Sequence, residues 1–92
     1  MQNDYKLGDW TIHPERGCIE RSGRIVHLKP KAMAVLNCLA EAAGGVVGRD
    51  TLFDEVWPGQ AISDATLTQC VVELRNALGD SARDPEYIET IP

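Results

Sequence analysis

Three carboxylates recur at short spacing in one predicted helix, and they are the first candidates for acid–base chemistry. Asp50, Asp54 and Glu55 lie in a segment, Arg49–Val56, that we expect to be helical. Carboxylates exchange protons with a substrate when they are positioned beside a partner base or nucleophile. The sequence places no such group next to them, so a solvated helix face explains them better. We therefore expect no catalytic residues and no enzymatic activity.

The cysteines and histidines are candidates for metal binding. Cys18, Cys38 and Cys70 are widely spaced, odd in number and without a C-x-x-C pair, which argues against a zinc site. His13 and His27 are far apart in strand-like segments, so we expect two surface histidines. Free thiols in a reducing cytoplasm are the simplest interpretation. We expect no metal, no cofactor and no small-molecule ligand in this domain, and an inert, half-buried thiol at Cys70 rather than a redox switch.

The segment Asp64–Leu78 carries polar side chains on one side and an apolar stripe on the other. Apolar residues at i, i+4, i+7 and i+11 predict a helix whose core positions are Leu67, Val71, Leu74 and Leu78. Ser63 or Asp64 should cap its start and Gly79 should end it. The opposite face carries Ala65, Gln69, Val72, Glu73 and Asn76. At about 1.5 Å per residue the helix is roughly 22 Å long, a length that suits the major groove of DNA.

The charge distribution, unlike the helix, argues against DNA binding. The 92 residues carry a net charge of −5, with +2 on residues 1–35 and −7 on residues 36–92. Lysine and arginine drive binding to phosphates, so charge alone argues against nucleic acid as the partner of the acidic half. No apolar run approaches a membrane span, and residues 1–5 do not resemble a signal peptide.

Length predicts one small domain, 1–92, that divides into three parts. Residues 1–29 alternate β-prone runs with turns and predict a small antiparallel sheet, with Ser22-Gly23 as its best hairpin turn. Residues 30–80 predict three helices. The first begins at Pro30 and runs to about Ala43, where Gly44-Gly45 should supply a left-handed stop.

The helix Arg49–Val56 should turn Leu52, Phe53 and Val56 inward, and Trp57-Pro-Gly should end it. Residues 81–92 hold a polar connection and a final strand, Tyr87–Ile91. A single strand needs a partner, so we expect it to be the start of a hairpin whose return strand is absent from this sequence.

Four segments in this order resemble the OmpR/PhoB-type winged-helix DNA-binding domain: residues 28–36, 47–57, 63–80 and 87–92. The Val-Trp, Leu-Arg and Glu-Thr-Ile-Pro sequences within them are modest signals singly and strong together. Within the family the chain looks most like the CadC/ToxR-like branch, in which this domain lies at the N-terminus. The resemblance implies an α+β winged helix-turn-helix, with an N-terminal antiparallel sheet, three helices and a C-terminal wing that is incomplete here.

The resemblance also implies a DNA-binding domain of a bacterial transcriptional regulator. Its third helix would enter the major groove of DNA. The side chains of this helix that would face the bases are those of Thr66, Thr68, Gln69, Val72, Glu73 and Asn76. Glutamine can bond adenine, and glutamate can accept from cytosine N4. Family positions that contact phosphates correspond here to Arg49, the Trp57 indole N–H and Arg75. For Trp57, the favoured interpretation is half-buried packing that also offers the N–H. For Arg75, the alternatives are a solvated surface residue and an ion pair with an acid on a neighbouring turn.

The chain departs from the family pattern on the reading helix. Many members have basic side chains at the positions that Cys70, Val72 and Glu73 occupy here. The alternative function is therefore a winged-helix module for self-association or RNA polymerase contact, with little DNA affinity of its own. The loop Pro58–Ser63 occupies the place where relatives touch polymerase. The expected partners are double-stranded DNA and, as a second candidate, RNA polymerase. A second copy of the protein is also expected, with the dimer formed by other parts of a full-length regulator. The CadC/ToxR-like branch further implies a membrane anchor in that full-length protein.

Overall fold

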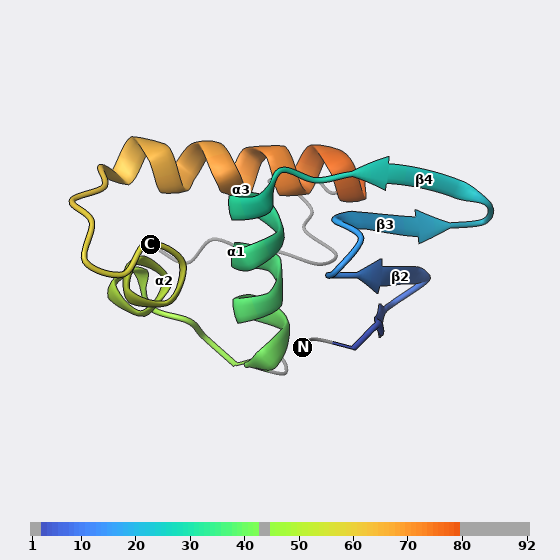
Figure 1. Cartoon of the computed structure of the whole chain (residues 1–92), viewed down its shortest axis with the longest axis horizontal. Helices are drawn as coiled ribbons and strands as arrows, with labels where there is room; N and C mark the ends of the chain where they lie inside the picture. Colours follow the sequence, from blue (N-terminus) through green and yellow to red (C-terminus); the bar gives the residue numbers. More distant parts are fainter. Residues whose placement is uncertain (1–2, 43–44, 80–92) are drawn as a thin grey trace.

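The computed structural model describes residues 3–42 and 45–79, which form a four-stranded sheet followed by three helices. The sheet lies on one side, α2 on the other and α1 between them, while α3 runs across all three (Figure 1). This is the α+β arrangement that the sequence predicted. The predicted wing segment, 81–92, lies outside the described residues.

The strands are β1 (Tyr5–Leu7), β2 (Trp10–His13), β3 (Cys18–Arg21) and β4 (Arg24–His27), and each pairs antiparallel with the next. The predicted hairpin turn at Ser22-Gly23 is confirmed. Ser22 has φ 51° and Gly23 has φ 79°, the two positive values that a tight two-residue hairpin requires.

One face of the sheet packs against the helices. Ile12 pairs with Ile19, which pairs with Val26, and both isoleucines are fully buried. On the edge strand β1, the Tyr5 hydroxyl donates to Asn37 Oδ1 of α1 at 2.7 Å. Burial, with a smaller contribution from Glu41, raises the pKa of Tyr5 to about 12. The tyrosine therefore stays neutral and keeps donating through the physiological pH range.

His13 is buried, so the prediction of a surface histidine was wrong for this residue. It is 7% exposed, and its Nδ1 lies 2.8 Å from Asp4 Oδ2 while its Nε2 lies 3.3 Å from Glu20 Oε1. A polar ring can be buried when both of its nitrogens find hydrogen-bond partners. Asp4 precedes β1 and Glu20 belongs to β3, so the pairing of strands creates the site. His27 is exposed as predicted.

Helix α1 spans Pro30–Glu41, two residues shorter than predicted. Its buried face consists of Ala32, Met33, Val35 and Leu36. The predicted left-handed stop at Gly44-Gly45 falls partly on Gly44, which lies outside the described residues. The C-cap is Ala42, which keeps a right-handed conformation, φ −73° and ψ −10°, and donates from its backbone N–H to the Leu39 carbonyl at 3.2 Å. The Gly45 backbone N–H donates to the Ala42 carbonyl at 2.9 Å.

Helix α2 spans Arg49–Val56, as predicted. Leu52 and Val56 are buried, whereas Phe53 is only partly buried. Lys31 of α1 donates from Nζ to the Val56 carbonyl at 2.9 Å. A lysine at the last carbonyls of a helix is favoured both by the hydrogen bond and by the helix dipole, so this contact ties the end of α2 to α1.

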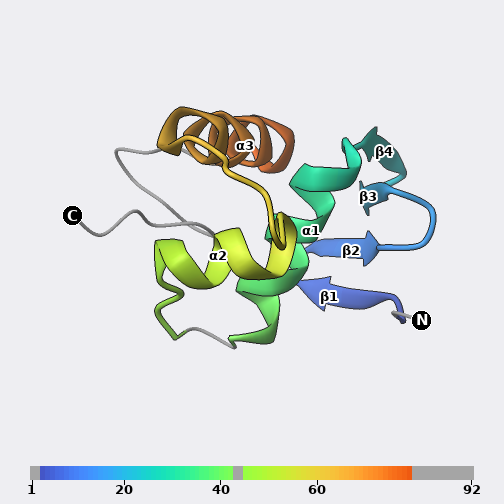
Figure 2. The same ribbon diagram turned by 60° about the vertical axis from the view of Figure 1, so that its left-hand side comes forward.

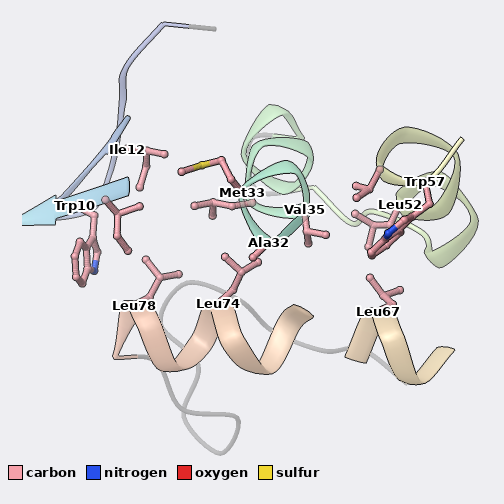
Figure 3. Close-up of a cluster of buried hydrophobic side chains, with 13 residues drawn as sticks. Trp10, Ile12, Ala32, Met33, Val35, Leu52, Trp57, Leu67, Leu74 and Leu78 are labelled. Carbon is pink, nitrogen blue, oxygen red and sulfur yellow. The ribbon is translucent and has the colours of Figure 1, made fainter. Parts of the chain in front are cut away.

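Helix α3 spans Asp64–Leu78, and both of its predicted ends are confirmed. The cap is Ser63, whose hydroxyl accepts from the Thr66 backbone N–H, and Gly79 closes the helix with φ 72°. Figure 3 shows the three contacts of the apolar stripe: Leu67 points towards α2, Leu74 towards α1 and Leu78 towards Trp10 of the sheet. All three leucines are at most 7% exposed. Val71, predicted as core, is only partly buried beside them.

Replacing Leu74 should destabilise the protein far more than replacing its neighbour Val72. Leu74 is fully buried, so Leu74→Ala should cost about 2–5 kcal/mol through lost burial and a cavity. Val72 is 42% exposed, and Val72→Ala should change the free energy of unfolding by less than about 0.5 kcal/mol. Urea denaturation of the two variants measures both values, and equal losses would contradict the assigned orientation of α3.

Candidate nucleic-acid interface

The outward face of α3 is polar, exposed and almost neutral. Gln69 and Asn76 are exposed and lie on the side of the helix opposite Leu74, as 100° per residue requires. Val72 lies between them and is 42% exposed. Thr66 and Thr68 are exposed near the start of the helix. Amide, hydroxyl and apolar groups of this kind can contact base edges without depending on charge.

Glu73 lies on one edge of this face and has a partner from outside the helix. Its Oε1 is 3.5 Å from Nζ of Lys29, the residue that precedes α1. The Glu73 side chain is 31% exposed and the Lys29 side chain 79% exposed. Lys29 was not among the residues predicted to form this surface. The signal that could have found it is a lysine at a helix cap, where serine, threonine, aspartate or asparagine is usual.

Arg75 lies on the other edge of α3, on the same side of the helix as Thr68 and about two turns further along. It is two residues from Glu73, and two helical steps turn the side chain to the opposite side of the helix. Arg75 is half-buried and already takes part in an interaction within the protein. The two edges of α3 therefore carry different groups, an acid paired with a lysine on one and an arginine on the other.

Arg49 joins the start of α2 to the start of α3. Its Nη1 lies 3.5 Å from Asp64 Oδ2, and the two side chains are 64% and 68% exposed. Both residues are the first of their helices, so the N-terminal ends of α2 and α3 lie close together. In Figure 2, α2 and α3 lie one above the other, joined by the loop that precedes α3. The arginine stays accessible despite its ion pair.

Trp57 belongs to the core and not to this surface. It is 5% exposed, and its ring lies 6.1 Å from that of Phe53, measured between centroids. Figure 3 places it beside Leu52 and above Leu67. The ring is more deeply buried than the half-buried position that the sequence predicted, because α2 and α3 both pack on it.

Cys70 lies on the Glu73 side of α3 and is partly buried. Burial raises the pKa of its thiol above the usual value, and the carboxylate of Glu73 raises it further, while the ammonium of Lys29 acts in the opposite direction. The thiolate is the reactive form of cysteine, so this environment disfavours reaction at neutral pH.

The acids Asp50, Asp54 and Glu55 are exposed along α2, as a solvated helix face requires. Within residues 3–42 and 45–79, no three histidine, cysteine or carboxylate side chains come together in a way that would hold a metal ion. Among the helices of that part, none has the length and apolar content to cross a membrane.

Known proteins match most of the chain. The family described as "Transcriptional regulatory protein, C terminal" matches residues 23–92. The chain is 36% identical over 88 residues to the transcriptional activator CadC of Escherichia coli. This match covers 95% of the chain but only 17% of CadC. It is 40% identical over 75 residues to the transcriptional regulator HilA of Salmonella typhimurium, covering 82% of this chain and 13% of HilA. The chain thus spans a small part of these relatives.

Solved structures match the fold. The DNA-binding domain of E. coli CadC has a TM-score of 0.84 and 34% identity, and the match covers 95% of this chain and 82% of that one. The Klebsiella pneumoniae RstA DNA-binding domain, in complex with its RstA box, has a TM-score of 0.82 and 27% identity over 98% of this chain and 90% of that one.

The reactivity of Cys70 should report on the Lys29–Glu73 pair without any DNA. In a Cys38→Ser background, Glu73→Gln should speed alkylation of Cys70, because it removes a carboxylate that raises the thiol pKa. Lys29→Gln should slow alkylation, because it removes the cation that lowers that pKa. Iodoacetamide labelling followed by mass spectrometry measures both rates. Changes in the same direction would contradict the arrangement of these three side chains.

Proposed function

Because the chain belongs to the family of DNA-binding domains of transcriptional regulators that residues 23–92 match, we propose that it reads double-stranded DNA with α3 in the major groove. The observation that carries this proposal is the orientation of α3. Its leucine stripe is buried against α2, α1 and the sheet, which leaves its polar face outward. The relative solved with its RstA box has the same fold, and this supports a duplex as the ligand.

The base-reading residues of this proposal are Gln69, Val72 and Asn76, with Glu73 at the edge. An amide can donate to and accept from one adenine edge, and an exposed valine can meet a thymine methyl group. Thr66 and Thr68, exposed near the start of α3, are placed to contact either bases or the adjoining sugar-phosphate. These roles rest on exposure and position on the helix face.

Phosphate contacts in this proposal come from Arg49 and Arg75. Arg49 is 64% exposed, and its 3.5 Å pair with Asp64 is an exposed one, so exchanging the carboxylate for a phosphate costs little. Arg75 lies on the edge of α3, where the groove wall would pass. Trp57 contributes mainly by packing, since only its indole edge could reach a phosphate from a ring that is 5% exposed.

A pair of such domains would bind more tightly than one. A nearly neutral reading face and few phosphate contacts give each domain a weak site, and joining two weak sites on a repeated half-site raises the overall affinity. In this proposal, other parts of a full-length regulator hold two of these domains together. If that regulator has a membrane anchor, the DNA-binding domain lies on its cytoplasmic side. RNA polymerase is a further partner of the proposal, and the loop Pro58–Ser63, exposed except for a partly buried Ile62, is the surface that would meet it.

Gln69 and Arg75 should have different effects on DNA binding. Gln69→Ala should change which duplex is selected from a randomised pool and cost about 1–3 kcal/mol on the original sequence. Arg75→Gln should weaken all sequences alike and reduce the salt slope of binding by about one unit. Fluorescence anisotropy at several salt concentrations measures both effects.

Gln60→Ala is the matched control, because Gln60 is an exposed amide in the loop before α3. It should leave both sequence preference and salt slope unchanged. If Gln69→Ala and Arg75→Gln acted identically, the division between base reading and phosphate contact would be wrong. If two such domains, joined in tandem so that they can pair on a repeated site, preferred no sequence at moderate salt, the proposed function itself would fail.

A further inference from the structure

Lys29 occupies a position that local helix chemistry disfavours. It is the N-cap of α1, with φ −65° and ψ 151°, and no side chain caps the helix there. The preferred residues at such a position accept a hydrogen bond from the helix, which an ammonium cannot do. Its positive charge also lies at the positive end of the helix dipole. Capping therefore does not account for a lysine at this place.

The ion pair with Glu73 does not by itself account for this lysine either. The two atoms are 3.5 Å apart, and Lys29 is 79% exposed. Exposed ion pairs of this kind contribute little to stability. The contrast with Lys31 is informative, because Lys31 donates at 2.9 Å to the Val56 carbonyl and so has a structural role. Lys29 keeps its ammonium in solvent beside α3.

The position of Lys29 relative to α3 suggests its partner. The connection from β4 to α1 runs alongside α3, and Glu73 marks the edge that it meets (Figure 1). Arg75 marks the opposite edge, because two residues turn the helix by about 200°. A helix in the major groove has a sugar-phosphate strand along each side. A cation on each edge of α3 would face one strand each.

We propose that Lys29 is a further DNA contact, binding a backbone phosphate on the α1 side of the groove. Its flexible stem carries the ammonium from Glu73 to the phosphate, and the released carboxylate becomes free to accept a hydrogen bond from a base edge. The proposal rests on the proposed function, since it requires α3 to enter the groove. Lys29 thus supplies a basic group at the Glu73 edge of α3, whereas the basic residue of the helix itself, Arg75, lies at the opposite edge.

The variant Lys29→Ser separates a DNA contact from a structural role. Serine is a preferred N-cap, so the midpoint of thermal unfolding should rise by roughly 4 °C. DNA affinity should nevertheless fall for all sequences, and the salt slope should decrease by about 0.9, the value for one phosphate contact. Lys29→Arg should restore the slope. Anisotropy titrations and thermal melts of the 92-residue chain measure these effects.

Two further variants complete the test. In a Glu73→Gln background, Lys29→Ser should still reduce the slope by about 0.9, because the phosphate contact does not depend on the carboxylate. Lys6→Gln is the matched control, since Lys6 lies on β1, at the edge of the sheet farthest from β4, and donates to Thr11 Oγ1 at 2.8 Å. It should leave the slope unchanged.

The outcomes distinguish this proposal from the function on which it rests. If the unaltered chain binds DNA and Lys29→Ser keeps its salt slope, Lys29 contacts no phosphate and the proposal is overturned. The same conclusion follows if the effect of Lys29→Ser vanishes in the Glu73→Gln background, because Lys29 would then act only through Glu73. If neither the single chain nor two copies joined in tandem bind a duplex at about 50 mM salt, the proposed function fails together with it.

Discussion

The burial of one leucine stripe on α3 is the constraint on which the rest of the structure depends. Leu67 packs towards α2, Leu74 towards α1 and Leu78 towards Trp10, so a single helix closes the core over three different elements. Because all three leucines are buried at once, α3 cannot rotate about its axis without exposing apolar surface. The outward direction of Gln69 and Asn76 is a consequence of this packing.

Two lysines at the start of α1, Lys29 and Lys31, have different roles because their tertiary surroundings differ. Lys31 reaches the carbonyl that ends α2, a contact that the helix dipole favours. Lys29 lies at the cap of its own helix and faces Glu73 on α3. The first lysine ties the end of α2 to α1. The second adds positive charge beside α3, the helix that we propose reads DNA and that carries one basic residue, Arg75.

The acidity of the second half of the chain is compatible with membership of a family of DNA-binding domains. The reason is the position of the acidic side chains in the structure. Asp50, Asp54 and Glu55 are exposed on α2 and do not belong to the outward face of α3. Asp64 is paired with Arg49 and Glu73 with Lys29, both at 3.5 Å. The acids on α3 thus have cationic neighbours, and the outward face keeps mainly neutral groups that suit selection among bases. Net charge described the chain as a whole and not this surface.

Local patterns in the sequence determined the elements, and tertiary contacts decided the surroundings of the side chains. Apolar periodicity, the cap at Ser63 and the left-handed Gly79 act within a few residues, so the bounds of α2 and α3 and the Ser22-Gly23 hairpin could be predicted. The burial of His13 depends on Asp4 and Glu20, and the Lys29–Glu73 pair joins residues 44 positions apart. No helical or strand period encodes such a contact, because it exists only after the elements have packed. The reading face was therefore predictable as a helix face, whereas the cation beside it became visible only in the folded protein.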